Sequence, residues 1–377
     1  METRIEHCQV YREKERFAGW PANYGLWSWD EEIVLGFAVG YMGGSEQQFH
    51  LRDRNRPFTT MQARSLDGGR TWVTRPFPGP TPGRRALSAD EHVVDELGLG
   101  DALSGQDCPH RPKPCPGGID FTTPDFAFMA AKTGLKEGAR SFFYTSRDRC
   151  RSWDGPYALP MFGQTAVAAR TDYLVLGPSE CLLFLTANKP DGKEGRTFCA
   201  RTRDGGATFE LVSFIGPENP GEGSDEGWRI MPASTRLPDG DLLVALRCGE
   251  PVRADQPWRH WIDLYHSDDK GKTWHHRSRP VPSTGTNGNP PTLDRLPDGR
   301  LCMTYGVRDK PYGIRAVLSS NHGRRWSEEI HLRDDGGAPD LGYPRTAILN
   351  DGTAVTAYYF ADEFEGERYI AATRWRP

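Results

Sequence analysis

One short pattern occurs five times in this chain and constrains its fold more than any other feature. The pattern reads Ser/Thr-x-Asp-x-Gly-x-Thr-Trp, with small departures in individual copies, and successive copies start 81, 56, 65 and 52 residues apart. A unit of about fifty residues that recurs along a chain indicates a repeat architecture, and strand-like flanks favour a β-propeller. The copies are SLDGGRTW at 65–72, SRDRCRSW at 146–153, TRDGGATF at 202–209, SDDKGKTW at 267–274 and SSNHGRRW at 319–326.

Each of these five segments, which we call boxes, contains the residues of a tight turn. The Asp side chain is able to accept hydrogen bonds from the backbone N–H groups of its own turn. The Gly supplies the positive φ that such a turn requires. The terminal Trp or Phe gives the hairpin a large apolar anchor. We therefore interpret the boxes as folding devices that lie away from any chemistry.

Hairpins precede the boxes in the second half of the chain. RLPDGDLLVALR at 236–247 predicts two strands joined by an Asp-Gly turn, and WIDLYHS at 261–267 predicts a third strand that leads into a box. The same order occurs twice more. It predicts an all-β fold, a six-bladed β-propeller of four-stranded antiparallel blades, as a single domain over residues 1–377. The predicted blades cover 20–72, 121–153, 165–209, 229–274, 291–326 and 343–375.

Two segments lie outside these blades. We expect the N-terminal strand at 4–11 to close the ring by pairing with the last blade, because closure removes exposed strand edges. A Pro-rich insertion at about 76–118 separates the first two blades and contains a helix signal at 88–104. It lies either over one mouth of the ring or on the rim. Cys108 and Cys115 near its end favour a solvated loop over a metal clip or a disulfide, because four ligands at metal spacing are missing.

Composition and missing motifs exclude several classes of function. The chain of 377 residues has a net charge of −4, so no overall positive field favours nucleic acid. No run of about eighteen apolar residues predicts a membrane span. Phosphate-loop, nucleophile-elbow and zinc-protease motifs are missing, and we expect neither a metal nor a cofactor. The N-terminus lacks an apolar signal core, which predicts a cytoplasmic protein, or a secreted or periplasmic one if a leader has been removed.

The repeated boxes in a six-bladed arrangement resemble those of the sialidase (neuraminidase) superfamily, the proteins with BNR or Asp-box repeats. The resemblance covers essentially the whole chain. It implies a glycosidase whose site lies where the inner strands of several blades converge on the axis. Because a fold alone does not determine an activity, the family's site residues are compared with this sequence one position at a time.

Two positions match catalytic residues of the family. Asp53 lies twelve residues before the first box, where the family has an acid/base Asp, and a carboxyl group there is able to protonate a leaving glycosidic oxygen. Tyr343 opens the last blade, where the family has a Tyr nucleophile, an exception to catalysis by two carboxylates. The residues alone also allow a surface Asp paired with neighbouring Arg side chains and a Tyr that packs inside its blade.

The family holds the carboxylate of its substrate with three Arg residues, because a planar guanidinium binds a carboxylate through two parallel hydrogen bonds. Arg247, in LLVALRC, matches the second position, and Arg315, in GIRAVLSS, is the natural match for the third. We add Arg229 as a further binding residue. An Arg on an apolar inner strand needs an anionic partner, which is either a substrate or a structural ion pair.

Three positions depart from the family pattern. Gly19 stands in place of the first Arg, and Arg16, three residues earlier, is the candidate substitute. Met231 stands in place of the Glu that activates the Tyr, and Glu226 or Asp225 in the preceding loop is the candidate for that role. Tyr359 stands in place of the Glu that supports the first Arg. The joint loss of the first Arg and its support predicts a remodelled pocket.

Together these residues predict a sialidase-like, exo-acting glycoside hydrolase that removes a terminal acidic sugar, sialic acid or a relative, from a glycan. The predicted catalytic residues are Asp53, Tyr343 and Glu226. The predicted substrate-binding residues are Arg247, Arg315, Arg229, Arg16, His50 and Arg345. Two alternatives remain: a propeller glycosidase or lyase that acts on a uronic or neutral sugar, and a propeller that binds carbohydrate without catalysis.

Overall fold

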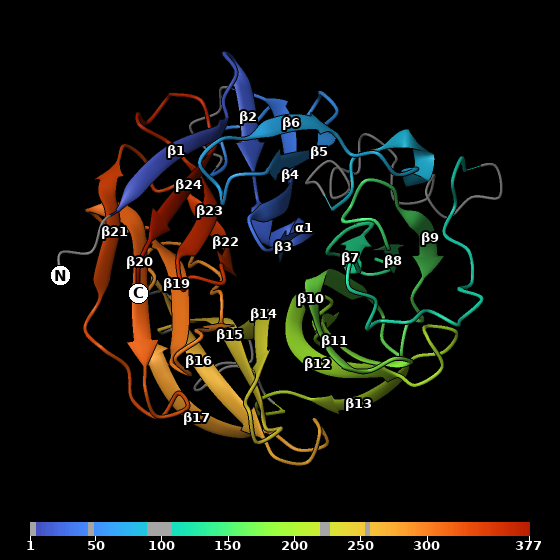
Figure 1. Ribbon diagram of the computed structural model, residues 1–377. Helices are drawn as coiled ribbons and strands as arrows, with labels where there is room; N and C mark the ends of the chain where they lie inside the picture. The colour runs from blue at the N-terminus through green and yellow to red at the C-terminus, as the bar shows by residue number, and fades with distance from the viewer. Residues whose placement is uncertain (1–4, 44–48, 89–107, 219–226, 253–256) are drawn as a thin grey trace.

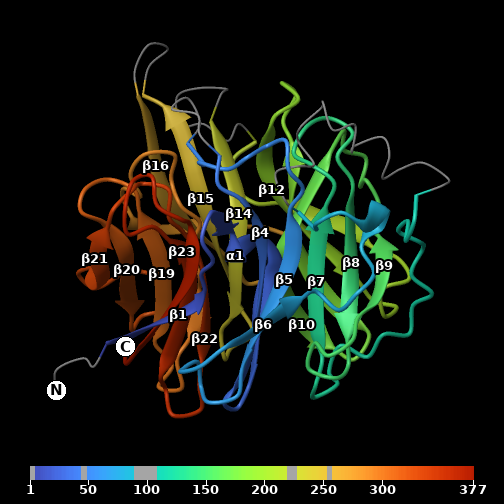
Figure 2. The same ribbon diagram turned by 90° about the horizontal axis from the view of Figure 1, so that it is seen from above.

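The hairpins of the sequence form six antiparallel sheets that stand around a central axis, as Figure 1 and Figure 2 show. The computed structural model describes residues 5–43, 49–88, 108–218, 227–252 and 257–377. Within a blade, the strands run in sequence from the axis to the rim of the ring (Figure 1). The predicted all-β, six-bladed propeller is therefore confirmed.

Blades 1, 2 and 3 form the first half of the ring. Blade 1 contains β2 (Arg16–Gly19), β3 (Gly25–Trp29), β4 (Glu32–Tyr41), β5 (Thr59–Ser65) and β6 (Val73–Pro76). Blade 2 contains β7 (Ala127–Lys132), β8 (Ser141–Ser146) and β9 (Asp154–Ala158). Blade 3 contains β10 (Val167–Gly177), β11 (Glu180–Asn188), β12 (Glu194–Thr202) and β13 (Glu210–Phe214).

The second half of the ring continues in the same order. Blade 4 contains β14 (Trp228–Arg236), β15 (Leu242–Pro251), β16 (Trp258–Ser267) and β17 (His275–Val281). Blade 5 contains β18 (Asp294–Arg295), β19 (Leu301–Val307), β20 (Tyr312–Ser319) and β21 (Ile330–Gly336). Blade 6 contains β22 (Gly342–Ile348), β23 (Ala354–Phe360) and β24 (Tyr369–Trp375), with β1 (Glu6–Tyr11) as its fourth strand.

The N-terminal strand closes the ring, as predicted. β1 pairs antiparallel with β24, with Glu6 opposite Arg374 and Cys8 opposite Ala372. The backbone N–H of Ala18 in blade 1 also donates to the carbonyl of Arg368, which precedes β24, at 2.7 Å. The first and last blades are thus joined by strand pairing as well as by packing, and the edge of β24 is covered.

The inner strand of blade 1 is interrupted at the axis. β2 pairs with the second half of β4, β3 pairs with its first half, and the one-turn helix α1 (Pro21–Tyr24) lies between them. Blade 1 therefore has five strands instead of the predicted four, and blade 2 has three among the described residues. The other four blades have four strands each, as predicted.

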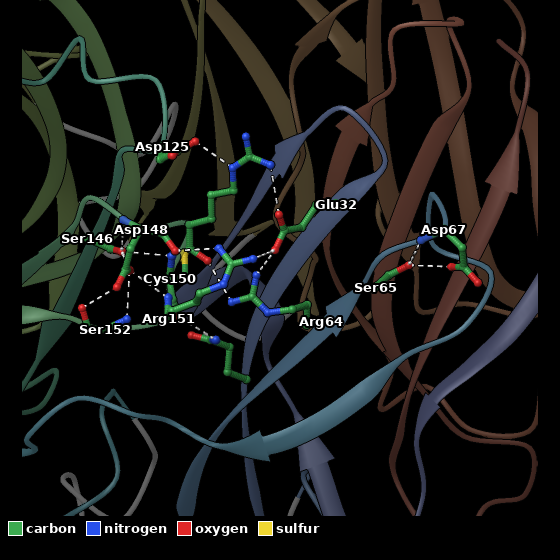
Figure 3. A network of polar contacts seen from close by, with 12 residues as sticks. Glu32, Arg64, Ser65, Asp67, Asp125, Ser146, Asp148, Cys150, Arg151 and Ser152 are labelled. Atoms are coloured by element: carbon green, nitrogen blue, oxygen red, sulfur yellow. Dashed lines mark hydrogen bonds and ion pairs between the residues drawn. The ribbon is translucent and has the colours of Figure 1, made fainter.

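Each box forms the turn between the last two strands of its blade, as between β5 and β6 in blade 1 and between β8 and β9 in blade 2. In the first box, the Oγ of Ser65 accepts the N–H of Gly69 at 2.8 Å, and the carboxylate of Asp67 accepts the N–H of Arg70 at 3.0 Å. Ser146 and Asp148 make the equivalent bonds in the second box (Figure 3). The boxes therefore all lie on one face of the propeller. Their hydrogen bonds are those of the turn itself.

The second box also connects two blades. The carboxylate of Glu32 in β4 is buried and accepts hydrogen bonds from Arg64, from Arg149 at 3.1 Å and from Arg151 at 3.0 Å (Figure 3). A buried carboxylate is stable only when its charge is compensated. The blade 1 to blade 2 contact thus depends on two Arg residues of the second box.

The insertion at 76–118 is described only at its two ends. Its first part contains the short 3₁₀ helix η1 (Pro82–Arg84). Apart from Ser88, the helix predicted at 88–104 lies outside the described residues. Cys108 and Cys115 are both free thiols, so neither forms a disulfide. In the described part of the chain, no helix is long and apolar enough to cross a membrane.

Candidate functional site

A cavity of about 350 Å³ opens at the end of the ring where the inner strands β14 and β22 begin. This end of the ring is opposite the face that carries the boxes. The strand before each box runs in the same direction as an inner strand, so it ends at the far face. We call this space the axial cavity, and its volume is that of a typical small-molecule pocket. Its lining comes from blades 1, 4, 5 and 6 and consists of Phe49, His50, Trp228, Arg247, Trp258, His260, Asn287, Arg308 and Tyr343.

Arg247 reaches the axial cavity from β15. Its Nη1 donates to the Oη of Tyr343 at 3.1 Å, and its Nη2 donates to the carbonyl of Asn287. Met231, which replaces the family's Glu, places its Sδ 3.4 Å from the same Nη1. Burial lowers the pKa of Arg247, Tyr343 opposes this effect, and the nearby cation Arg308 adds to it. The cavity wall is therefore electropositive.

Arg308 is a second cation in the same wall, and the sequence comparison missed it. It follows β19 directly and is 2% exposed. Its guanidinium donates to the carbonyls of Leu341 at 3.1 Å and Gly288 at 2.8 Å, and to the Oη of Tyr359 at 2.7 Å. One signal was available in the sequence: Arg247 and Arg308 lie seven and nine positions after the Gly of their Asp-Gly turns. Both spacings are odd, so the two residues fall on the same face of a second strand or of its direct continuation.

Neither cation is paired directly with a carboxylate in the part of the chain that the structure describes. Burial opposes ionisation of Glu194, and Arg247 helps Arg170 to lower the pKa of this carboxyl, but the ion pair of Glu194 is with Arg170. No ion pair with Asp or Glu is formed by Arg247 or Arg308 in the described ranges. Both guanidinium groups instead bind carbonyl and hydroxyl oxygens, which carry no charge. Since a buried cation without a counter-ion is costly, the cavity favours an anionic ligand.

Tyr343 is held at the mouth of β22 by its backbone. Its N–H donates to the Oδ1 of Asn289 at 2.8 Å, and Asn289 itself is fully buried. A Cβ at the preceding Gly342 would lie 2.2 Å from the same Oδ1. Tyr343 also has a φ of 51°, a conformation that costs a non-glycine residue of order 1–3 kcal/mol. The side chain is thus fixed toward Arg247 by rigid surroundings.

His50 enters the axial cavity from the segment between β4 and β5. Its Nδ1 lies 2.7 Å from Oδ1 of Asp340, whose side chain is 1% exposed. The same carboxylate accepts the Oη–H of Tyr359 at 2.7 Å and the Nε–H of Arg368 at 3.1 Å. Burial opposes ionisation of Asp340, but His50, Arg368 and Tyr359 outweigh it and hold the pKa of this carboxyl well below its usual range.

Aromatic rings line the axial cavity on the side of blade 4, where the guanidinium of Arg247 lies 5.0 Å from the centroid of the Trp228 ring. Trp228 and Trp258 stack with their ring centroids 6.3 Å apart, and His260 stacks on Trp258 at 6.2 Å. Burial, together with Arg247 and Arg308, lowers the pKa of His260 to about 4. This imidazole is therefore neutral near neutral pH, and the wall offers flat, mostly uncharged surfaces.

Two of the predicted site residues lie outside the axial cavity in blade 1. The carboxylate of Asp53 accepts the N–H of Asn55 at 2.9 Å, within its own turn. The guanidinium of Arg16 lies over the ring of Tyr41, 3.9 Å from its centroid. Neither side chain lines the cavity, so their predicted roles rest on the sequence comparison alone.

Two further Arg residues point into blade walls rather than toward the axis. Arg229 donates to the Oη of Tyr265 at 3.1 Å and lies 3.7 Å from the carboxylate of Asp263. Arg315 donates to the carbonyl of Arg333 at 2.5 Å and forms an ion pair with Asp334. The structure corrects their predicted positions: the alternative of a structural ion pair applies to both, and Arg308 stands where Arg315 was expected.

Arg345 belongs to a second cavity, of about 220 Å³, which also lies on the axis. Its Nη2 donates to the carbonyls of Ala22, at 2.7 Å, and Thr171, so it does not line the axial cavity. Asp172 and Asp294 line the same second cavity. Of the predicted site residues, the structure therefore brings together His50, Arg247 and Tyr343. Glu226 lies outside the described residues.

The second cavity makes the stability of the fold depend on pH. Burial raises the pKa of Asp294 to about 7, above its unfolded value near 4. Neutral Asp294 therefore makes its full contribution to the free energy of unfolding below about pH 4. This contribution is lost as the pH rises through about 7, because the buried carboxyl group then ionises. Asp294→Asn should melt above wild type at about pH 8, with this advantage lost at about pH 4. The exposed Asp298→Asn is the control variant. If the melting temperatures of Asp294→Asn and wild type differ equally at the two pH values, this expectation is contradicted.

Comparison with known proteins identifies the fold. No protein-family model and no curated protein matches the sequence. Among solved structures, the chain is similar to a protein of unknown function from Dyadobacter fermentans, with 21% identity, a TM-score of 0.68 and coverage of 99% of both chains. It is similar to an α-L-arabinanase from Penicillium chrysogenum, with 13% identity, a TM-score of 0.56 and coverage of 98% of both chains.

A third similar structure is a sialidase from Trypanosoma rangeli in complex with sialic acid. The identity is 12% and the TM-score is 0.58, over 98% of this chain and 58% of the sialidase chain. At these identities the likeness shows a shared fold and does not transfer an activity. The chain thus has the β-propeller fold of this arabinanase and this sialidase.

Proposed function

We propose that the protein is an exo-acting glycoside hydrolase that binds a terminal acidic sugar in the axial cavity and removes it from a glycan. The observation that carries the proposal is the pair of buried cations, Arg247 and Arg308, which line one cavity and form no direct ion pair with a carboxylate in the described ranges. The carboxylate of a sugar would supply the missing negative charge. The similarity in fold to sialidases and arabinanases supports a glycosidase at a coarse level.

The remaining walls suit a sugar ring. Trp228 and Trp258 provide flat apolar faces beside the cations, and such faces pack on the C–H face of a sugar while its hydroxyls bind polar groups. A cavity of about 350 Å³ suits a single terminal residue of a glycan. Sialic acid is the specific substrate that we propose, because it carries its carboxylate on the anomeric carbon, so that cations beside Tyr343 would hold the carbon that is attacked.

Tyr343 is the proposed nucleophile. Its Oη lies 3.1 Å from the Nη1 of Arg247, and a guanidinium at this distance stabilises a phenolate. Met231 occupies the position at which the family has an activating Glu, so Arg247 replaces a base by electrostatic stabilisation in this proposal. The role of Glu226 remains the prediction made from the sequence.

Turnover assays test the proposed function directly. Purified protein should cleave 4-methylumbelliferyl sialoside or the corresponding glucuronide and should leave the neutral galactoside intact, because only the acidic sugars compensate the two cations. Cleavage of neutral glycosides alone would reject the proposal. Binding of free sialic acid without turnover of any glycoside would favour the non-catalytic, carbohydrate-binding alternative.

One observation favours a second candidate, a lyase that acts on a uronic acid. No Asp or Glu of the described ranges lines the axial cavity, whereas His50, His260 and Tyr343 do. Neutralisation of a uronate carboxylate by Arg247 and Arg308 would acidify the neighbouring C–H group, and a His or Tyr would then remove its proton. Elimination leaves an unsaturated sugar, whose ultraviolet absorbance distinguishes this reaction from hydrolysis.

A further inference from the structure

The ring of His50 is fixed by one of its nitrogen atoms and leaves the other available. Nδ1 is engaged with Asp340 at 2.7 Å. The ring also packs edge to face against Trp20, 5.4 Å away, and Phe49, 5.1 Å away. The side chain remains 21% exposed and lines the axial cavity. Among the described residues, Nε2 has no hydrogen-bond partner, so it is the nitrogen that a cavity ligand would meet.

The charges around His50 favour proton transfer. Asp340 is buried and ionised, so it both fixes the Nδ1–H tautomer and stabilises an imidazolium, the role of the carboxylate in a catalytic triad. Tyr359 and Arg368 hold the other lone pairs of this carboxylate. Arg52 donates to the backbone carbonyl of His50 at 3.3 Å. The imidazole is thus fixed by an anion at Nδ1 and presents Nε2 to the axial cavity.

We infer that His50, oriented by Asp340, is the general acid and base of the site, in place of Asp53. This inference rests on the proposed function, because it assigns the proton transfer of that reaction. His50 lines the axial cavity together with Tyr343, whereas the carboxylate of Asp53 is engaged in its own turn. An acid must reach the glycosidic oxygen of the sugar that the nucleophile attacks.

In the proposed reaction, His50 acts first as an acid and then as a base. The Nε2–H of the His50 imidazolium gives its proton to the glycosidic oxygen, which keeps the electron pair of the breaking C–O bond and leaves as an alcohol. The Tyr343 phenolate forms a C–O bond to the anomeric carbon. Neutral His50 then takes a proton from water, whose oxygen attacks the anomeric carbon, and the electron pair of the Tyr–sugar bond returns to Tyr343. The imidazolium and the phenolate are both restored.

The test separates acid catalysis from folding by using two leaving groups. His50→Asn keeps a donor at the Nδ1 position for Asp340 and removes Nε2. We expect kcat/KM for a sialyl-lactose, a poor leaving group, to fall by about 10²–10⁴-fold. For 4-methylumbelliferyl sialoside, kcat/KM should fall by less than about tenfold, because its leaving group, 4-methylumbelliferone, needs little protonation to depart. If wild type cleaves only the glucuronide, the matching alkyl and aryl glucuronides replace this pair. Imidazole should restore activity to His50→Ala.

A matched control exists in blade 4. His266 also pairs with an Asp, with its Nε2 2.6 Å from Asp241, but it does not line the axial cavity. His266→Asn should leave the ratio of the two substrates unchanged. Equal losses on both substrates in His50→Asn, or a leaving-group effect in Asp53→Asn instead, would overturn the assignment while the proposed function stands. Wild-type protein that cleaves no acidic glycoside would overturn the proposed function and this inference with it.

Discussion

Tyr343→Phe should reduce kcat on an acidic glycoside by about 10³-fold or more while changing KM little. The substitution removes only the Oη that we propose as nucleophile, and loss of a nucleophile in enzymes with covalent intermediates has effects of at least this size. The phenyl ring keeps the packing of Tyr343 against Tyr359, whose ring centroid lies 5.9 Å away. Steady-state kinetics with 4-methylumbelliferyl sialoside or glucuronide measures the effect.

Tyr265 provides the matched control for this prediction. Its Oη also contacts an Arg, the Nε of Arg229 at 3.1 Å, but inside the wall of blade 4. Tyr265→Phe should lower the melting temperature and leave kcat close to that of wild type. A Tyr343→Phe variant with nearly full kcat would exclude Tyr343 as nucleophile and favour attack by water.

The second large effect is expected at Arg247. Arg247→Lys keeps a positive charge but loses the planar fork that binds a carboxylate through two hydrogen bonds. We expect kcat/KM for the acidic glycoside to fall by about 10²-fold, because hydrogen bonds to charged groups contribute about 1.5–3 kcal/mol each. The loss should appear largely in KM and in the affinity for free sialic acid, which isothermal titration calorimetry measures.

Arg229→Lys is the control for this second prediction. Arg229 is as buried as Arg247 but bonds to Tyr265 and Asp263 in the blade wall. Its replacement should lower stability and leave the affinity for the acidic sugar unchanged. If Arg229→Lys and Arg247→Lys weaken sugar binding equally, the effect is structural, and the carboxylate is not bound by Arg247.

The fold was predictable because its signals are local. Each box satisfies its own hydrogen bonds within eight residues, as the bonds of Ser65 and Asp67 show, and each Asp-Gly turn joins neighbouring strands. Ring closure by 4–11 followed from the need to cover an edge. The break in the inner strand of blade 1 was not predictable from such signals, because α1 is stabilised by contacts with distant strands at the axis.

The site was predictable only in part, because the direction of a side chain depends on contacts with residues that are distant in the sequence. Arg247, Tyr343 and His50, three of the residues named from the sequence, line the axial cavity together. Arg315 and Arg308 lie seven residues apart around one hairpin, and no local pattern predicts that Arg315 pairs with Asp334 and with the carbonyl of Arg333 in the blade wall. The partner of His50, Asp340, lies 290 residues away in the sequence, so no local pattern connects the two.

A structure of the protein soaked with sialic acid or its 2,3-dehydro analogue tests the central claim most directly. We expect the sugar in the axial cavity, with its carboxylate oxygens within hydrogen-bonding distance, about 3 Å, of the guanidinium groups of Arg247 and Arg308. A sugar bound with its carboxylate away from both groups, or bound only outside the axial cavity, would contradict the claim that these two cations select an acidic sugar.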